Sequence, residues 1–357
     1  MIETDFTKTK KNIFMHINGM HHLGLILPIC RSNPDYDFYI YSENISQEAY
    51  KNERIYHLDN VYFPDDVTDC LFKLNNFGLF IGTDLQLTSA HRKGLQLAKK
   101  FRDAGVSVIE LQHGLFQLGF HYFSIPRKDF TAGDVNPVIS YADSHLYFHS
   151  AEVGANVIGY PPTLEKKKDN YEGEYCLILS NLHWDTYTNI ERLDFYFAMI
   201  RMVLEFKDQQ FIWRMHHGEQ ISSTCKMLLV SACVFYGVSI NKLKNLLINP
   251  TGGLNPDISS LIAKSSAVVS TVSTVLLDVE MYEKNTMVFD CDSIHKLVDL
   301  LKIKTTFREY ADLTSLFDTK NPLLTGRLVE YDNSIFRKVV DDYFSLPCEV
   351  SVKKNVL

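Results

Sequence analysis

The sequence lacks the cysteine patterns that mark disulfide-rich or redox-active proteins. Its seven cysteines are scattered along the chain, none belongs to a C-x-x-C pair, and most lie inside apolar runs. An odd and unpatterned set of this kind is typical of reduced, buried thiols and not of a disulfide framework. We therefore expect the chain in a reducing compartment, the cytoplasm.

Long apolar runs are missing too. The longest, Leu23–Cys30, is far shorter than the ~20 residues that a membrane-spanning helix needs. The lysines near the N-terminus precede only a short apolar stretch that is broken by His16, which differs from a signal peptide. These absences predict a soluble, cytoplasmic protein, and peripheral contact with the inner face of the membrane stays open as an alternative.

The chain has fewer basic than acidic residues, so its formal net charge is −7 and the sequence pI is about 6.0. Proteins that bind the phosphate backbone of nucleic acids concentrate positive charge on their surface. Nucleic acid is therefore excluded as the main partner of this chain.

Signatures of common cofactors and metals are absent as well. The one glycine pair that follows a predicted strand matches neither G-x-G-x-x-G nor a P-loop, so dinucleotide and ATP sites are not indicated. The adjacent histidine pairs, His21/His22 and His216/His217, would point their rings apart on a strand, and no H-x-x-x-H or D-x-D motif frames them. We expect neither a cofactor nor a metal.

The length and the hydrophobic pattern predict two α/β domains. With 357 residues the chain is too long for one ordinary core, and short apolar strands alternate with helices as in parallel βαβ units. A break at Gly159–Pro162 and a charged segment interrupt the pattern before it restarts. We predict one domain over 1–162, a linker over 163–174, a second domain over 175–330, and a C-terminal helix and tail over 331–357 that pack back on the first domain.

The individual elements follow from apolar spacing and turn residues. Predicted strands cover Ile13–Ile17, Phe38–Tyr41, Phe77–Gly82, Val106–Leu111, Ser144–His149, Val157–Gly159, Tyr175–Leu179, Gln210–Met215, Asn245–Asn249, Ala267–Ser270 and, as the final strand, Met287–Asp290. Predicted helices cover Ala90–Asp103, Ile190–Phe206, Ser222–Tyr236, Asp257–Lys264, Val275–Tyr282 and Ile335–Phe344.

Ligands of open parallel sheets bind beyond the carboxyl ends of the strands, so polar residues directly after a predicted strand are the site candidates. The densest group is a hydroxyl-rich turn of Ser270, Thr271, Ser273 and Thr274, after which a helix begins. Amides without helical partners and the positive end of the helix dipole suit a phosphate there, and Asp278, one turn further, can accept both hydroxyls of a ribose. Ordinary helix capping explains the same residues as an alternative.

A second group follows the strand predicted over 106–111. Gln112-His113-Gly114 places a histidine at a strand tip, next to a glycine that lets the backbone turn and leaves the imidazole accessible. Histidine titrates near neutral pH, so His113 can take a proton from an acceptor hydroxyl, with Gln112 on the acceptor side. A hydrogen-bonded structural histidine is the alternative, since the chain has 13 histidines.

A third group ends the strand predicted over 210–215. Arg214 and His216 share one face of an extended chain, so both can neutralise the charge that develops on a leaving diphosphate. An arginine paired with a carboxylate beneath the sheet is the alternative.

Three weaker groups also follow strands. The loop that contains His21 and His22 fits acceptor binding, and Asn181 fits a donor phosphate or sugar. Gly252 and Gly253 would let the backbone approach the base of a nucleotide.

Together these groups resemble the motifs of GT-B enzymes that build bacterial surface polysaccharides, above all the CDP-glycerol glycerophosphotransferase family, with kinship to Kdo- and sialic-acid-transferring enzymes. The family's aromatic-His-Gly motif corresponds to Gln112-His113-Gly114, with Gly119 at a later glycine, and its basic-x-His-Pro motif corresponds to Arg214–His217. Its acidic-aromatic-Ser-Ser turn corresponds to Thr271–Thr274, followed by Asp278. The chain departs from the pattern at Gln112 and at His217 and lacks the family's lysines after the His-Gly motif, so the transferred group stays open.

The resemblance implies two Rossmann-type domains that face each other across a donor-binding cleft. It implies His113 as the base on the acceptor side and His216 as the group that assists the leaving phosphate. Ser273 and Thr274 would hold the donor phosphates, and Asp278 would lie near the ribose. A cytidine-linked donor, a glycan or lipid-linked glycan acceptor and metal-independent chemistry are implied in the same way.

The sequence therefore predicts a glycosyltransferase, or a polyol-phosphate transferase, that extends a surface glycan such as capsule or lipopolysaccharide. One alternative is a sugar-nucleotide epimerase or hydrolase on the same fold, which would act on the donor alone. Another is a non-catalytic protein that binds a sugar nucleotide as an assembly partner. A retaining mechanism with a covalent intermediate would need a carboxylate, for which Asp84, Glu110 and Asp185 are candidates.

Overall fold

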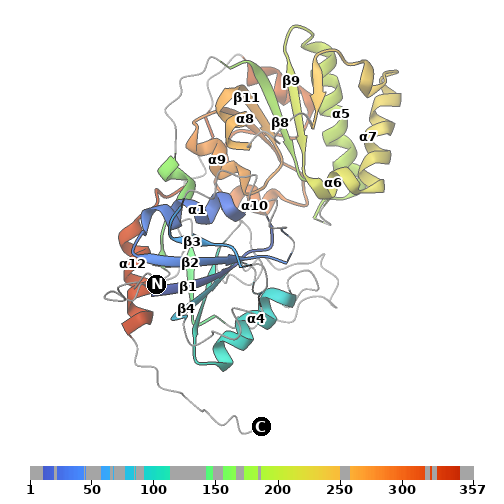
Figure 1. Cartoon of the computed structure of the whole chain (residues 1–357). Helices are drawn as coiled ribbons and strands as arrows, with labels where there is room; N and C mark the ends of the chain where they lie inside the picture. The colour runs from blue at the N-terminus through green and yellow to red at the C-terminus, as the bar shows by residue number, and fades with distance from the viewer. Residues whose placement is uncertain are drawn as a thin grey trace. The chain divides into compact units, whose positions relative to one another are not determined.

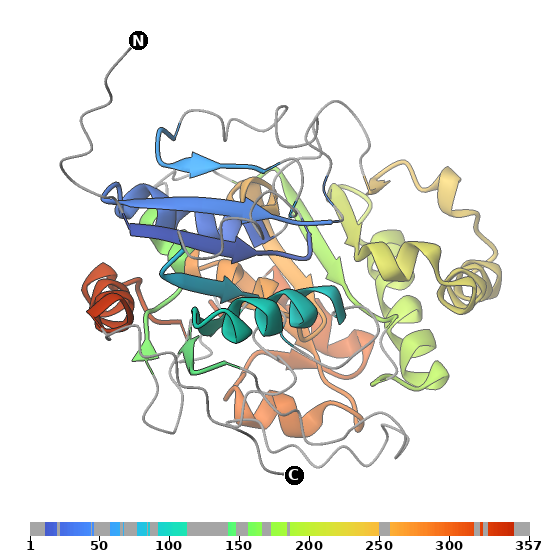
Figure 2. The same cartoon turned by 60° about the horizontal axis from the view of Figure 1, so that its bottom comes forward.

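The computed structural model describes residues 11–19, 22–43, 45, 58–64, 67, 77–83, 85, 92–112, 142–147, 156–165, 173–183, 186–249, 258–317, 322–323 and 328–345. These residues form two compact units (Figure 1 and Figure 2). The first unit holds the described residues up to Glu165 and from Val329 onward, and the second holds those between Lys166 and Leu328.

The first unit contains a sheet with the strand order β3-β2-β1-β4-β5-β6-β7, in which every neighbouring pair is parallel. Its central strand β4 is buried throughout and β5 is buried from Val108 onward, because helices cover both faces of such a sheet. The strands are β1 (Lys11–His16), β2 (Tyr36–Tyr41), β3 (Val61–Tyr62), β4 (Leu79–Gly82), β5 (Ser107–Leu111), β6 (Ser144–Tyr147) and β7 (Asn156–Val157).

Helices α1 (Leu23–Ser32) and α4 (Arg92–Asp103) lie on opposite faces of this sheet (Figure 1). Helix α4 packs against an aromatic cluster in which the Phe14 and Phe101 rings lie 4.8 Å apart. It ends at Gly105, whose φ of 83° is the left-handed value expected of a glycine cap. Helix α1 falls on the longest apolar run, where the sequence predicts no helix, and it contains Pro28.

Helix α12 (Asn333–Ser345) belongs to the first unit although it lies at the other end of the sequence. Phe336 and Val340 are fully buried, and Asp341 accepts hydrogen bonds from Lys11 Nζ at 2.6 Å and from the Tyr36 hydroxyl at 2.8 Å. The prediction that a C-terminal helix packs back on the first domain is therefore confirmed.

The second unit contains a sheet with the order β10-β9-β8-β11-β12-β13, again parallel throughout. Its strands are β8 (Tyr175–Ser180), β9 (Phe211–Met215), β10 (Leu246–Ile248), β11 (Ser265–Ser270), β12 (Asn285–Phe289) and β13 (Thr306–Phe307). The helical segments are α5 (Asn189–Glu205), α6 (His217–Ile221), α7 (Ser223–Phe235), η6 (Ile240–Lys242), α8 (Ile258–Lys264), α9 (Val275–Met281), α10 (His295–Leu300), α11 (Tyr310–Leu313) and η7 (Thr314–Leu316).

The predicted α/β class and the predicted parallel sheets are confirmed. The expectation that the strand at Met287–Asp290 is the last one is wrong, because β13 follows it and pairs with it in parallel. β13 is only two residues long, which is too short for an apolar period to be recognised.

The two sheets share one strand order. Numbered along the chain within each unit, the first six strands lie in the order 3-2-1-4-5-6, which is the order of the dinucleotide-binding fold. The order reverses between β1 and β4 in the first unit and between β8 and β11 in the second. Sheets of this type bind ligands at the carboxyl ends of the strands that flank this reversal.

The state of the cysteines and the hydropathy of the helices can be compared with the sequence predictions. The cysteines of the described part, Cys30, Cys176, Cys225, Cys233 and Cys291, are free thiols in buried positions. Among the described helices, none combines the length and the apolar character that crossing a bilayer requires.

Candidate functional site

Polar residues follow the strands of the second unit at one edge of its sheet. Asn249, His216, Asn181 and Thr271 come directly after β10, β9, β8 and β11, which are neighbours in that order. Because parallel strands place their carboxyl ends along the same edge, these residues form a row. Asn181 and Thr271 lie at the reversal point of the strand order, where ligand binding is expected.

The reversal point is closed by backbone contacts and contains a buried acceptor. The Asn181 amide donates to Thr271 Oγ1 at 3.0 Å, and the Thr271 amide donates to the Leu179 carbonyl at 3.0 Å. The side chain of Asn181 is buried, and within the described residues its Oδ1 has no hydrogen-bond partner. A buried acceptor of this kind costs free energy, which a bound group that donates a hydrogen bond would recover.

The turn after β11 divides into a structural part and an accessible part. Ser270 and Thr271 are fully buried, and the Ser270 hydroxyl donates to the Thr271 carbonyl at 2.8 Å. Thr271 Oγ1 accepts from the Asn181 amide, so Ser270 and Thr271 shape the turn. Ser273 and Thr274 are half-buried, and their contact with a donor phosphate stays a prediction.

Helix capping does not account for Thr274. It precedes α9 with helical φ and ψ of −59° and −28°, and its side chain makes no capping hydrogen bond. The first helical bonds run from Leu276 and Leu277 to the carbonyls of Ser273 and Thr274. In the described part of the chain, no carbonyl accepts from the amides of Ser273 or Val275. The predicted ribose ligand Asp278 is only 7% exposed, so its role stays a prediction.

His216 caps helix α6 and stacks on a second histidine. Its Nδ1 accepts a hydrogen bond from the Gly218 amide at 3.1 Å, and its ring lies parallel to that of His183 with centroids 4.5 Å apart. His216 is an exposed residue, but partial burial of its ring, followed by the charge of neighbouring His217, lowers the pKa of His216. Since Nδ1 is an acceptor, the neutral ring carries its proton on Nε2 and offers that N–H as a donor at neutral pH.

Gly218 is the residue that allows the two rings to stack. A Cβ at this position would lie 2.3 Å from His183 Cδ2 and 2.4 Å from His183 Nε2. Any side chain larger than hydrogen at position 218 would therefore displace the His183 ring. The face of the His216 ring that His183 covers would then be uncovered. Arg214, the other predicted phosphate ligand, is half-buried on β9 two residues before His216.

Behind these residues lies a buried carboxylate that the sequence analysis missed. Glu219 is 1% exposed and accepts from the Ser180 hydroxyl at 3.0 Å, the Leu182 amide at 3.1 Å and the Tyr196 hydroxyl at 2.8 Å. Burial raises its pKa, while these hydrogen bonds oppose the rise. Glu219 thereby ties the loop after β8 to α5 and α6. An acid in the first turn of a helix is too common in sequences to have marked this role.

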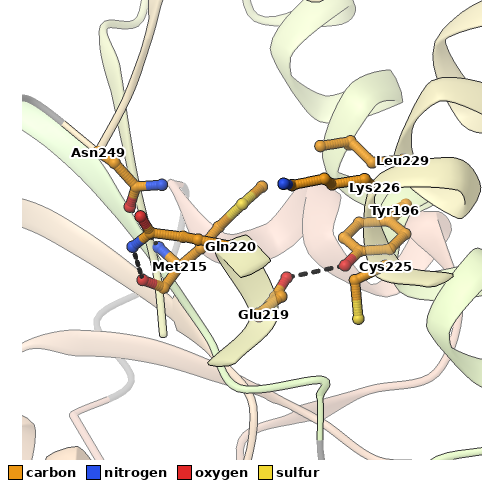
Figure 3. Close-up of a pocket in the computed structure, with 8 residues that line it drawn as sticks. All are labelled: Tyr196, Met215, Glu219, Gln220, Cys225, Lys226, Leu229 and Asn249. Atoms are coloured by element: carbon orange, nitrogen blue, oxygen red, sulfur yellow. Dashed lines mark hydrogen bonds between the residues drawn. The ribbon is translucent and has the colours of Figure 1, made fainter. Parts of the chain in front are cut away.

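A cavity of about 290 Å³ opens beside the ends of β9 and β10 (Figure 3). The side chains of Lys226 and Asn249 extend into it from opposite sides. Asn249 Oδ1 accepts from the Met215 amide at 2.9 Å, and Gln220 Nε2 donates to the Met215 carbonyl at 2.9 Å. The residues that line it are Tyr196, Met215, Glu219, Gln220, Cys225, Lys226, Leu229 and Asn249.

Sequence analysis also missed Asp290, which follows β12. It accepts from His295 Nδ1 at 2.9 Å and from Arg308 Nε at 3.2 Å, and it is 5% exposed. Arg308, which follows β13, also pairs with Asp292. The predicted boundary of the last strand hid this group, because the sequence analysis placed Asp290 inside the strand.

In the first unit, the corresponding reversal point lies between β1 and β4. His22, predicted to bind the acceptor, is 1% exposed, and its Nδ1 lies 3.1 Å from Thr83 Oγ1 and accepts from the Asn18 amide at 3.2 Å. These contacts hold the loop after β1, and the acceptor role of His22 stays a prediction. At the end of β1, the buried His16 pairs with Glu43 at 2.9 Å. Burial opposes ionisation of Glu43, but the hydrogen bond from His16, a backbone hydrogen bond and the nearby positive charges of His16 and Lys93 together lower the pKa of that carboxyl.

Other predicted residues of the site have no described contacts that test them. Gln112 follows β5, is fully buried, and its amide donates to the Leu146 carbonyl at 3.0 Å. His113, His21, Gly252 and Gly253 lie outside the described residues. Among the described residues, no group of three or more His, Cys, Asp or Glu side chains is arranged to hold a metal.

Comparisons with known proteins give no sequence relative and a clear structural likeness. No protein-family model matches the chain, and no curated protein matches it. A UDP-GlcNAc 2-epimerase from Methanocaldococcus jannaschii, solved with UDP-GlcNAc and UDP, matches with a TM-score of 0.58 at 12% identity, covering 93% of this chain and 99% of that one. A putative UDP-N-acetylglucosamine 2-epimerase from Listeria monocytogenes matches with a TM-score of 0.57 at 12% identity, covering 94% and 97%.

The wall teichoic acid polymerase TagF, in an H444N variant, matches with a TM-score of 0.53 at 13% identity, covering 94% of this chain and 84% of that one. Two kinds of enzyme that use this architecture, sugar-nucleotide epimerases and a surface-polymer polymerase, are thus similar to this chain over nearly its whole length. At these identities the likeness establishes the fold, and the chain has the GT-B fold.

Proposed function

We propose that the chain is a GT-B transferase that moves a sugar, or a polyol phosphate, from a nucleotide-activated donor onto a hydroxyl of a growing surface glycan. One observation carries the proposal. The half-buried Ser273 and Thr274 follow Thr271 after β11, and His216 with its Nε2–H follows β9, so both groups lie at the carboxyl edge of the sheet next to the reversal point between β8 and β11. The teichoic acid polymerase among the structural neighbours supports a surface-polymer enzyme.

In this proposal the leaving nucleotide phosphate is stabilised by donors that are already in place. The amides of Ser273 and Val275 and the Nε2–H of neutral His216 would donate to phosphate oxygens, and Arg214 would supply positive charge. For a sugar, the C–O bond to the nucleotide phosphate breaks and the nucleoside mono- or diphosphate leaves; for a polyol phosphate, the P–O bond inside the diphosphate breaks and the nucleoside monophosphate leaves. In both cases a bond to the acceptor oxygen forms, and the acceptor proton passes to a base. The sequence analysis predicts His113 as that base.

Binding of the donor is tested by thermal shift with CMP, CDP, UDP, GDP and ADP. A ligand that binds only the folded state stabilises it by about 2.7 kcal/mol at 100 times its dissociation constant, so the nucleotide is readily identified. We expect CDP or CMP to give the largest shift, because the sequence resemblance points to a cytidine-linked donor. A variant with Ser273→Ala and Thr274→Ala should lose the shift. Unchanged binding in that variant would remove this turn from the donor site.

A sugar-nucleotide epimerase is the second candidate, and the epimerases among the structural neighbours favour it. The two reactions differ in their need for an acceptor. A transferase releases nucleotide in an acceptor-dependent way, whereas an epimerase converts the donor alone. Inverting a stereocentre that carries hydrogen breaks the bond to that hydrogen, so an epimerase would incorporate deuterium from D2O into the recovered donor. Nucleotide binding without turnover in either assay would identify a non-catalytic binding protein.

A further inference from the structure

Helix α7 carries an apolar face that the second unit leaves uncovered. Met227, Val230, Val234 and Phe235 are exposed to 61%, 60%, 70% and 70%. The first three recur at i, i+3 and i+7, so they lie on one side of the helix. Residues that share the exposed side include the small Ser223 and Ser231.

The opposite side of the same helix is already packed. Cys225, Leu228, Ala232 and Cys233 are buried, and α5 lies between α7 and strand β8 (Figure 1). A surface helix of a globular protein normally turns charged and polar residues outward, whereas a helix that is apolar all round is covered on every side. Helix α7 has apolar residues on all sides, as a fully covered helix has, yet it lies at the edge of its unit. Its outer side therefore lacks a partner within the described part of this chain.

The exposed aromatic ring at the end of α7 is held in place. The rings of Phe235 and Phe197 lie 4.8 Å apart, and Tyr236 meets Phe235 edge-on at 5.1 Å. Phe235 remains 70% exposed despite these neighbours. A ring that is fixed and outward-facing loses little conformational entropy when it is inserted into an apolar phase.

The chain segment that carries this face has charge of one sign. Residues 220–256 contain Lys226, Lys242 and Lys244 and no aspartate or glutamate, in a chain whose net charge is −7. All three lysines are exposed. Lys226 lies in the first turn of α7, and Lys242 and Lys244 follow the turn after Phe235, so lysines flank the apolar stripe along the sequence on both sides.

We infer that the outer face of α7 docks on an anionic lipid surface, with Met227, Val230, Val234 and Phe235 inserted and the three lysines among the headgroups. Exposed apolar side chains flanked by lysines, in a segment without acidic residues, suit binding at such an interface. A second copy of the chain fits less well, because a two-fold contact through this face would set three lysines against three lysines without a carboxylate from the segment. The inference does not depend on which nucleotide or acceptor the enzyme uses.

The test is flotation of the full-length chain with vesicles of phosphatidylcholine alone and of phosphatidylcholine with phosphatidylglycerol, roughly 3:1. We expect binding to the mixed vesicles that weakens as NaCl is raised, since salt screens the lysines. Replacing a lysine by Gln should lower the partition coefficient about fivefold for each position. Absence of binding to the anionic vesicles would overturn the inference.

The apolar part is tested by Val230→Glu with Val234→Glu, and a matched control is available. Ile190 is 74% exposed at the start of α5, outside the stripe, so Ile190→Glu adds a charge at an equally exposed apolar position. We expect the double variant to lose vesicle binding and the control to keep it, with both retaining the thermal unfolding of the parent. Equal loss in the control would contradict the inference. So would a dimer in light scattering that the double variant converts to a monomer, which would assign the face to a second copy.

Discussion

His216 performs two tasks that substitutions can separate. Its Nδ1 caps α6, and its Nε2–H is the proposed donor to the leaving phosphate. His216→Asn keeps an oxygen that can cap the helix but removes the imidazole, so turnover should fall ~10²–10³-fold with little change in stability. His216→Ala should lose turnover and, in addition, about 1 kcal/mol of stability. Nucleotide release and thermal unfolding measure the two effects, and near-parental turnover in His216→Asn would remove this residue from the reaction.

The lowered pKa of His216 also predicts a pH dependence of stability. The folded state favours the neutral ring, so the stabilisation is complete above the unfolded value of about 6.5 and is lost as pH falls through the lower folded value. Urea unfolding of the parent and of His216→Asn between about pH 8 and pH 5 isolates this contribution. We expect the parent to lose more stability than the variant on acidification. Parallel curves would show that the ring does not titrate differently on folding.

Gly159 is a residue whose replacement should be costly for two reasons. Its φ is 79°, and a Cβ there would lie 2.0 Å from the carbonyl oxygen of Glu330. Gly105 has a similar φ of 83° with nothing within 4 Å, so Gly105→Ala isolates the cost of the dihedral, about 1–2 kcal/mol. Gly159→Ala should destabilise the first unit by clearly more than this in chemical unfolding. Equal destabilisation by the two substitutions would mean that the Glu330 segment moves away from the new Cβ without a loss of stability.

The loop after β8 depends on one carboxylate of helix α6. Glu219 accepts three hydrogen bonds there, two at Oε1 and one at Oε2. Glu219→Gln turns one acceptor into a donor that faces another donor, which should destabilise the second unit by ~1–3 kcal/mol. Because the loop carries Asn181 and His183, the KM for the donor should rise. A variant with parental stability and parental KM would show that the loop is held by other contacts.

The elements that sequence predicts well are those with a clear apolar period. Helix α5 and strand β8 lie within one residue of their predicted bounds. Helix α1 escapes prediction because its sequence is apolar on nearly every side, so no period of 3.6 stands out, and Pro28 argues against a helix. The short α6, which carries Glu219, is hidden between β9 and α7 for the same reason that β13 is: too few residues to show a period.

The sequence predicts which residues of the candidate site follow strands, but it does not predict which of these residues lie next to one another. That Asn181 and Thr271 follow strands can be read from the apolar runs before them. That their strands are neighbours depends on the strand order, which pairs β8 with β11 across 90 residues. No local pattern encodes that pairing, and the stacking of His183 on His216 depends in the same way on the pairing of β8 with β9.

The whole chain passes from the first unit to the second and back again. A deletion that begins at Val329 would remove α12 and leave Lys11, Asn33 and Tyr36 without their partners Asp341 and Asn333. We expect hydrogen exchange to rise in β1, β4 and β5, while β8, β9 and β11 keep their protection. A chain that ends at Ser345 retains every α12 contact described and is the control. Full protection of the first unit in the longer deletion would show that α12 is dispensable.

Because α12 belongs to the first unit, it also determines the order in which the two units can complete their folding during synthesis at the ribosome. The unit translated second is complete once Leu328 emerges, whereas the unit translated first still awaits Phe336 and Val340 to seal its sheet. Completion therefore runs opposite to translation, and the first unit carries an unsealed apolar surface until α12 has emerged. A chaperone that holds emerging chains would find its substrate there, in the half of the protein that is made earliest and finished last.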